Sequence, residues 1–137
     1  MLRSSTELRH SYLQIQQWIT ACNNQHSDCL VHGLNDTVLP TRLLNIEIGQ
    51  ASTIRLVNTA EWFRSRPKAR YMTLSHCWGS LKILTLRRAK LESLMAGFKV
   101  EELPLSFQHA IQLARSFGVQ YLWIDSLWYD SLIHPRA

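Results

Sequence analysis

Four residues with the chemistry of zinc ligands lie close together in the N-terminal part of the chain. They are spaced Cys22-x3-His26-x2-Cys29-x2-His32. Two thiolates and two imidazoles match the number and softness of the ligands that tetrahedral zinc prefers. A helix that continued through this stretch would place Cys22, His26 and Cys29 on one face. Because the spacing is not that of a standard zinc finger, the alternative is a helix end with packed cysteines and solvated histidines.

Polar residues also gather at two places that would form one crevice. Ser75 begins a Ser-His-Cys-Trp-Gly run that ends at Gly79, and Asp125 is followed by Ser126. If the strands that precede these runs are parallel neighbours, both runs lie at the carboxyl ends of strands, where open α/β sheets bind ligands. The alternative is that Ser75 and Asp125 only cap strand ends and bond to nearby loops.

Several catalytic arrangements are not expected from the sequence. A triad of Ser75, His76 and Asp125 is disfavoured because adjacent strand residues point to opposite faces of a sheet. The sequence has no G-x-S-x-G elbow, no phosphate-binding P-loop and no G-x-G-x-x-G fingerprint. Cys77 beside His76 would suit a thiol nucleophile, although a buried free cysteine is the more frequent case.

The elements that would position the crevice form a β…α-β unit. Apolar residues at helical spacing predict a helix over 106–117 with Ser106 as its N-cap, between strands expected at 71–76 and 119–124. Such a connection makes the two strands parallel. Upstream, a capping box of Ser4 and Glu7 and an apolar stripe that includes Tyr12 predict an N-terminal helix. A β-hairpin is expected within 39–57, with Leu44, Ile46 and Ile48 on one face of its first strand. We therefore expect an α/β fold, with a partial, open, parallel sheet preceded by an N-terminal helix and a β-hairpin.

Composition limits the class of protein. The chain has 137 residues, 46% of them hydrophobic and 18% charged, which is typical of a globular protein. No apolar run approaches the ~20 residues of a membrane helix, and the polar N-terminus does not resemble a signal peptide. Three cysteines favour a reduced, cytoplasmic protein over a disulfide scaffold. The net charge is +5, and the densest basic groups, within 64–70 and 87–90, have the pattern of solvated loop or helix faces, so neither nucleic-acid nor membrane binding is expected.

Three blocks of sequence carry a family resemblance. They are Tyr71-Met-Thr-Leu-Ser-His-Cys-Trp-Gly79, Leu103-Pro-Leu-Ser-Phe-Gln-His-Ala-Ile111 and Tyr121-Leu-Trp-Ile-Asp-Ser-Leu127. In this order they resemble the heterokaryon-incompatibility (HET) domain of filamentous fungi. The stretch from Trp18 to Cys29 and the run Leu39-Pro-Thr-Arg-Leu43 resemble the segment that often precedes that domain.

The resemblance implies a fungal protein of non-self recognition, a form of innate immunity. In this family the domain triggers programmed cell death when unlike hyphae fuse, usually under control of a protein partner or an attached sensor domain. The family has been likened to the TIR fold, a flavodoxin-like α/β sandwich, which agrees with the β…α-β unit. TIR relatives suggest either self-association or cleavage of NAD, which would be a substrate of full-length relatives. Glu92, Glu101 and Glu102 match no catalytic motif.

The sequence departs from the family pattern after Leu127. The family continues with cysteine, isoleucine, a variable residue, glutamine and aspartate, whereas here Trp128-Tyr-Asp-Ser-Leu-Ile-His-Pro-Arg-Ala137 follows. We therefore expect a chain truncated within the HET domain that is not a stand-alone enzyme. The expected segments are a helix and Cys/His-rich lead-in (1–38), a hairpin and linker (39–70), the N-terminal part of the HET domain (71–127) and a divergent tail (128–137).

The expected function is that of a heterokaryon incompatibility domain-containing protein, here as a fragment. The alternatives are a TIR-like NAD-cleaving enzyme in full-length form and a zinc-supported interaction module. The tryptophans would wall the crevice, the glycine would allow a tight turn, and the serines and aspartate would supply polar groups. The expected crevice residues are Ser75, Trp78, Gly79, Trp123, Asp125 and Ser126.

Overall fold

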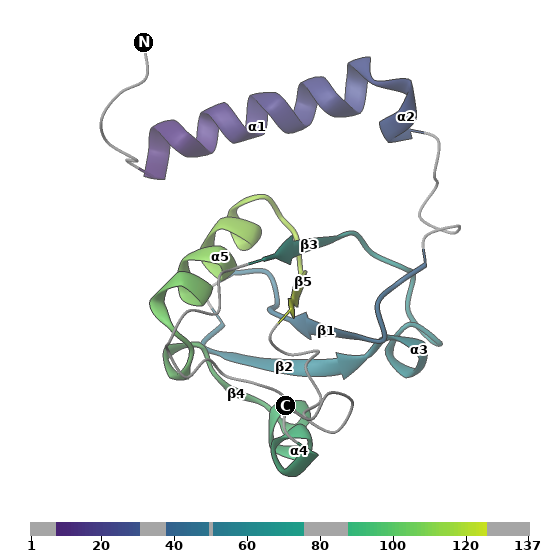
Figure 1. Ribbon diagram of the computed structural model, residues 1–137, viewed down its shortest axis with the longest axis vertical. Helices are drawn as coiled ribbons and strands as arrows, with labels where there is room; N and C mark the ends of the chain where they lie inside the picture. Colours follow the sequence, from purple (N-terminus) through teal and green to yellow (C-terminus); the bar gives the residue numbers. More distant parts are fainter. Residues whose placement is uncertain (1–7, 31–37, 50, 76–87, 126–137) are drawn as a thin grey trace, which may run out of the picture. The chain divides into compact units, whose positions relative to one another are not determined.

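The computed structural model describes residues 8–30, 38–49, 51–75 and 88–125 (Figure 1). The chain divides into two compact units, Met1–Thr37 and Val38–Ala137. The hairpin and the strands after residue 70 belong to one unit, because they share a sheet.

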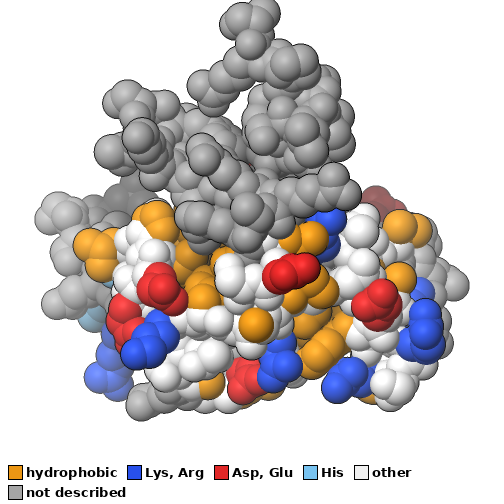
Figure 2. All heavy atoms as spheres, turned by 90° about the horizontal axis from the view of Figure 1, so that it is seen from below, with side chains coloured by type: hydrophobic (Ala, Val, Ile, Leu, Met, Phe, Trp, Pro, Cys, Tyr) orange, Lys and Arg blue, Asp and Glu red, His pale blue; other side chains and the backbone are white. Residues whose placement is uncertain are grey.

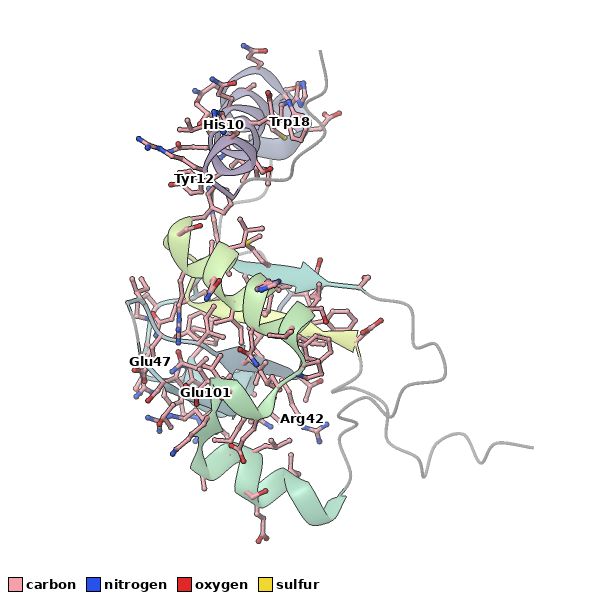
Figure 3. All side chains as sticks on the ribbon, turned by 90° about the vertical axis from the view of Figure 1, so that its left-hand side faces the viewer. His10, Tyr12, Trp18, Arg42, Glu47 and Glu101 are labelled. Atoms are coloured by element: carbon pink, nitrogen blue, oxygen red, sulfur yellow. The ribbon has the colours of Figure 1, made fainter. Side chains whose placement is uncertain are left out.

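The first unit contains α1 (Leu8–Gln25) and α2 (Ser27–Leu30). The N-terminal helix is therefore confirmed, while its expected capping box at Ser4 and Glu7 lies outside the described residues. Tyr12, on the predicted apolar stripe, is half-buried, whereas Trp18 is 64% exposed and projects to a different side of α1 (Figure 3). In the part of the chain that the structure describes, no helix is long and apolar enough to cross a membrane.

The second unit is built on one open sheet of five strands in the order β3-β5-β1-β2-β4. The strands are β1 (Arg42–Asn45), β2 (Thr53–Asn58), β3 (Tyr71–Leu74), β4 (Phe98–Lys99) and β5 (Tyr121–Ile124). The expected parallel pair is confirmed, since β3 and β5 run parallel. The hairpin of β1 and β2 is also confirmed, and it joins the same sheet because β1 pairs antiparallel with β5. The sheet as a whole is therefore mixed.

The backbone conformation of Glu47 explains why the buried face of the first hairpin strand ends before Ile48. Leu44 and Ile46 are buried on one face, as alternation predicts. Glu47 then adopts φ +51°, a left-handed conformation that an extended strand does not have. Alternation is lost there, and Ile48, expected on the buried face, is 61% exposed.

Helices cover one face of the sheet. These are α4 (Arg88–Ala96) and α5 (Leu105–Ser116), and Figure 1 shows α5 lying along the sheet. Burial of an apolar helix face against apolar strand residues is the main source of stability for such a layer. The main core has these buried members: Leu44, Ile46, Ile54, Leu56, Leu94, Leu103, Phe107, Ile111, Ala114, Leu122 and Ile124.

The N-cap of helix α5 lies two residues before the position that the sequence suggests. We expected Ser106 to cap the helix, but the N-cap is Pro104, and the Gln108 side chain donates to the Leu103 carbonyl at 2.7 Å. Proline fits this position because helix starts do not use its missing N–H. The helix ends as expected before Gly118, which has φ +70°.

A smaller core lies on the opposite face of the sheet. It consists of Leu43, Val57 and Tyr121, and side chains from α3 (Thr59–Trp62) and the segment after it pack against it. Asn58 starts α3, because its Oδ1 accepts from the N–H groups of Ala60 and Glu61 at 3.0 and 3.3 Å. This face is the one that carries the candidate site.

The surface carries charges of both signs. Figure 2 shows Lys and Arg side chains next to Asp and Glu side chains on the face seen from below, with hydrophobic side chains between them. A mixed surface of this kind is typical of a globular protein.

Candidate functional site

The structure brings the ends of the two HET-like strands together. In the parallel pair, Leu74 of β3 lies opposite Ile124 of β5. Ser75 and Asp125 are the next residues on each strand, so they leave the sheet at the same edge. This is the edge where open α/β sheets commonly bind ligands.

The expected crevice residues are only partly described. Ser75 is exposed, and Asp125 is half-buried with its Oδ1 oxygen shielded from solvent. Trp123, two residues before Asp125, is half-buried and on the face opposite α5. The other three expected residues, Trp78, Gly79 and Ser126, lie outside the described residues, as do His76 and Cys77.

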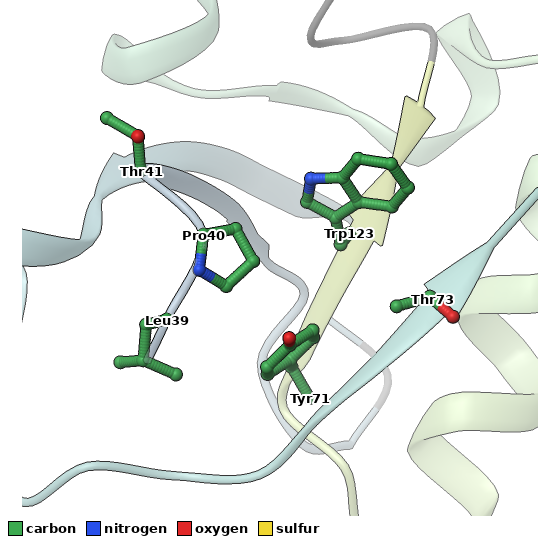
Figure 4. Close-up of a pocket in the computed structure, with 6 residues that line it drawn as sticks. All are labelled: Leu39, Pro40, Thr41, Tyr71, Thr73 and Trp123. Atoms are coloured by element: carbon green, nitrogen blue, oxygen red, sulfur yellow. The ribbon is translucent and has the colours of Figure 1, made fainter. Parts of the chain in front are cut away.

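An open groove lies on this same face, over β3 and β5 (Figure 4). Its volume is about 540 Å³. Trp123 of β5 lies between the strand β3 on one side and the segment leading into β1 on the other. The lining residues are Leu39, Pro40, Thr41, Tyr71, Thr73 and Trp123.

Strand alternation explains which residues reach the groove. On β3, Met72 and Leu74 pack into the main core, so Tyr71 and Thr73 face the other way. Sequence reasoning found Trp123 but missed these two, although the alternation of 71, 73 and 75 was available as a signal. No such signal indicated that residues 39–41 line the groove, because their position there depends on the pairing of β1 with β5.

Hydrogen bonds fix the wall that comes from residues 39–41. The buried Thr59 donates its hydroxyl to the Pro40 carbonyl at 2.5 Å, and its backbone N–H donates to the Thr41 carbonyl at 2.9 Å. These two bonds join the start of α3 to the segment that lines the groove. Such paired backbone contacts hold a loop in one geometry.

An aromatic cluster supports the sheet face beside the groove. The Trp62 Nε1–H donates to the Tyr121 hydroxyl at 2.9 Å, and the rings of Phe63 and Tyr121 meet edge to face with centroids 5.1 Å apart. The Arg66 guanidinium lies over the Trp62 ring, 3.8 Å from its centroid. Edge-to-face and cation–π contacts of this kind add stability beyond area burial.

The chemistry of the described groove residues suits binding. Its lining has more apolar than polar surface and supplies hydroxyl groups from Thr41, Tyr71 and Thr73. The described lining residues include no carboxylate, imidazole or thiol, which are the usual groups for acid–base or nucleophilic work. A groove of this composition suits an apolar side chain or ring with hydrogen-bonding neighbours.

The expected zinc ligands are only half described. Cys22 lies near the end of α1 and is half-buried, while His26 is exposed between α1 and α2. The His26 N–H donates to the Cys22 carbonyl at 3.2 Å, so these two residues are one helical turn apart. The side chain of Cys29 and the whole of His32 lie outside the description. Within the described residues, no three His, Cys, Asp or Glu side chains group around a metal position, and the zinc site stays a prediction.

One comparison with known proteins gave a match, and the matched residues include β3, β5 and the helices between them. Residues 71–128 match the family model described as Heterokaryon incompatibility protein (HET). Neither the curated proteins nor the solved structures gave a match to the chain. The matched range begins at the first residue of β3 and includes all of β5. Residues 71–128 of this chain are therefore a HET region, similar in sequence to the heterokaryon incompatibility family.

Proposed function

We propose that this chain acts in fungal non-self recognition, in signalling that leads to programmed cell death. The observation that carries the proposal is the match of residues 71–128 to the HET family. Death on fusion of unlike hyphae is the role that this family resemblance implies. The proposal places the chain in the cytoplasm, where it acts with a protein partner or by self-association.

Within this role, the chain works by binding and not as a stand-alone enzyme. The groove beside β5 is lined by apolar and hydroxyl-bearing side chains, which supports a binding role. The glutamates considered for NAD cleavage, Glu92, Glu101 and Glu102, are all exposed, and none of them lines the groove. The binding role is therefore better supported than the NAD-cleaving alternative.

Inducible expression in a filamentous fungus tests the signalling role. We expect expression of the chain to arrest growth and to admit a membrane-impermeant dye into the hyphae. Asp125→Asn, at the carboxyl edge of the parallel pair, should reduce this effect at equal protein level. Glu61→Gln makes the same chemical change at an exposed position outside the HET region and should leave it intact. Normal growth on expression of the unaltered chain would contradict the proposal.

Incubation with NAD tests the binding role separately. The purified chain should release no nicotinamide above the rate of spontaneous hydrolysis. Release that depends on the protein, and that disappears in Asp125→Asn but not in Glu61→Gln, would replace the binding role with the enzymatic one.

A further inference from the structure

Positive charge is concentrated in one part of the sequence. Eight of the 15 Lys and Arg residues, and none of the 10 Asp and Glu residues, fall between positions 62 and 91. The eight are Arg64, Arg66, Lys68, Arg70, Lys82, Arg87, Arg88 and Lys90. The first four lie in the segment between α3 and β3, and all four are exposed.

This basic segment, residues 64–70, crosses the sheet face that carries the groove. Ala69 packs against the small core of Leu43, Val57 and Tyr121. The next residue but one, Tyr71, lines the groove. Arg70 is exposed and directly precedes Tyr71. The cationic segment therefore leads straight into one wall of the groove.

The groove itself carries no charge among its described lining residues. Leu39 and Pro40 form an aliphatic wall, and Tyr71 and Trp123 provide aromatic surface. Such a surface accepts an apolar side chain, while a cationic neighbour attracts the acidic residues that flank it. Long-range attraction between the basic segment and an acidic partner would also raise the rate of encounter.

We propose that the groove and the basic segment together bind an acidic peptide segment of a partner protein. The peptide places an apolar or aromatic residue over Trp123, between Tyr71 and Pro40. Its carboxylates face the cations of residues 64–70. This inference names a partner class for the proposed signalling role and rests on it.

The composition of the groove favours a peptide over a nucleic acid. Proteins that bind single-stranded nucleic acid line the binding groove itself with cations and stack bases on successive aromatic rings. Here the cations belong to the segment that leads into Tyr71 and do not line the groove, and half of the described lining residues are Leu39, Pro40 and Thr41, which offer no ring for stacking. An apolar anchor between acidic residues matches this arrangement better.

Fluorescence anisotropy with defined peptides tests the proposal on the full chain. The probe is a fluorescein-labelled peptide, Asp-Glu-Asp-Leu-Phe-Asp-Glu-Asp, with blocked ends. One control peptide has Asn and Gln in place of the acids, and the other has Ser-Ser in place of Leu-Phe. We expect each control to bind at least about tenfold more weakly, and binding of the probe to weaken as salt rises.

Variants of the chain test the basic segment and the groove separately. The double variant Lys68→Glu and Arg70→Glu should weaken binding about tenfold, since each exposed ion pair contributes modestly. Lys99→Glu is the matched control, because β4 lies at the opposite edge of the sheet from β3, and it should bind within about twofold of the unaltered chain. Thr73→Phe narrows the groove at an exposed position and should weaken binding without changing the circular dichroism spectrum.

Three results would overturn the proposal. The first is equal binding of the acidic peptide and its Asn/Gln control. The second is tighter binding of single-stranded oligothymidine, which would assign the surface to nucleic acid. The third is a dimer of the chain that Thr73→Phe dissociates, which would assign the groove to a second copy. Because binding is measured in vitro and growth arrest in hyphae, failure of this proposal is distinguishable from failure of the signalling role.

Discussion

Arg115, in the last turn of α5, holds the backbone of Ile46 at the end of strand β1. Its Nη2 and Nε atoms donate to the Ile46 carbonyl at 2.6 and 3.0 Å. The same guanidinium donates to the carbonyls of Glu47 and Ala51 at 3.1 and 2.6 Å. One side chain thus joins the helix to both sides of the turn between β1 and β2. The planar fork of arginine supplies donors in the geometry that this task needs.

Removal of this side chain should lower the stability of the fold. Arg115→Met leaves part-buried carbonyl oxygens without their charged donor, at a cost of about 2 kcal/mol in the free energy of unfolding. Arg115→Lys keeps the charge but loses the fork, so we expect about half that loss. Urea titration followed by circular dichroism gives the values. Arg64→Met, at an exposed cation, is the control, and an equal loss there would contradict the prediction.

The contribution of Arg115 should not depend on pH in the usual range. Burial lowers the pKa of Arg115 from its ordinary value, and the nearby Glu47 carboxylate raises it in part. A lowered pKa means that the folded state releases the proton more readily, so stability would rise with pH only in strongly alkaline solution. Below that range arginine is charged in both states. The stability difference between the unaltered chain and Arg115→Met should therefore be constant from about pH 5 to about pH 9.

The hydrogen bond between Trp62 and Tyr121 should contribute measurably to the small core. Tyr121 is 4% exposed, and Tyr121→Phe keeps the edge-to-face contact with Phe63 while it removes the acceptor for Trp62 Nε1. We expect a loss of about 1 kcal/mol by urea unfolding. In a double-mutant cycle with Trp62→Phe the two losses should not add. Full additivity would show that this bond does not contribute.

Local sequence patterns were sufficient to predict much of the fold. The helical spacing around Ile111 and the strand patterns near 71–74 and 121–124 predicted the parallel pair, which the structure confirms. The place of β1 beside β5 could not be predicted, because pairing between strands far apart in sequence leaves no periodic signal. For a truncated domain, an uncovered edge or face is expected at strand 119–124. The edges of this strand are instead covered, since β5 is paired with β3 on one side and with β1 on the other.

The candidate site was less accessible to sequence reasoning. Ser75 and Asp125 could be placed at one sheet edge, because parallel neighbours end together. The groove could not be predicted, since one of its walls comes from Pro40 and Thr41, which Thr59 positions through bonds across a long sequence separation. Distant backbone contacts of this type depend on the completed tertiary structure.

The zinc hypothesis for the N-terminal unit has a direct chemical test. If Cys22, His26, Cys29 and His32 bind zinc, the purified chain should contain stoichiometric metal by atomic absorption. Chelation with EDTA should then lower the helical circular dichroism signal, because metal binding and folding are coupled. Cys22→Ser should abolish the metal content, and Cys77→Ser should not. Metal-free protein with a spectrum unchanged by EDTA would contradict the hypothesis.

Gly97, between α4 and β4, should tolerate substitution less well than Gly118, after α5. Gly97 has φ +125°, and a Cβ there would lie 3.2 Å from the Thr53 Cγ2 atom. Gly118 has φ +70° and open space around it, so only the left-handed backbone opposes a side chain. We expect Gly97→Ala to cost about 2 to 3 kcal/mol and Gly118→Ala about 1 kcal/mol in urea unfolding. Gly118→Asn should cost less than Gly118→Ala because asparagine accepts this conformation. A Gly97→Ala variant as stable as Gly118→Ala would show that the turn at residue 97 relaxes around the added methyl group.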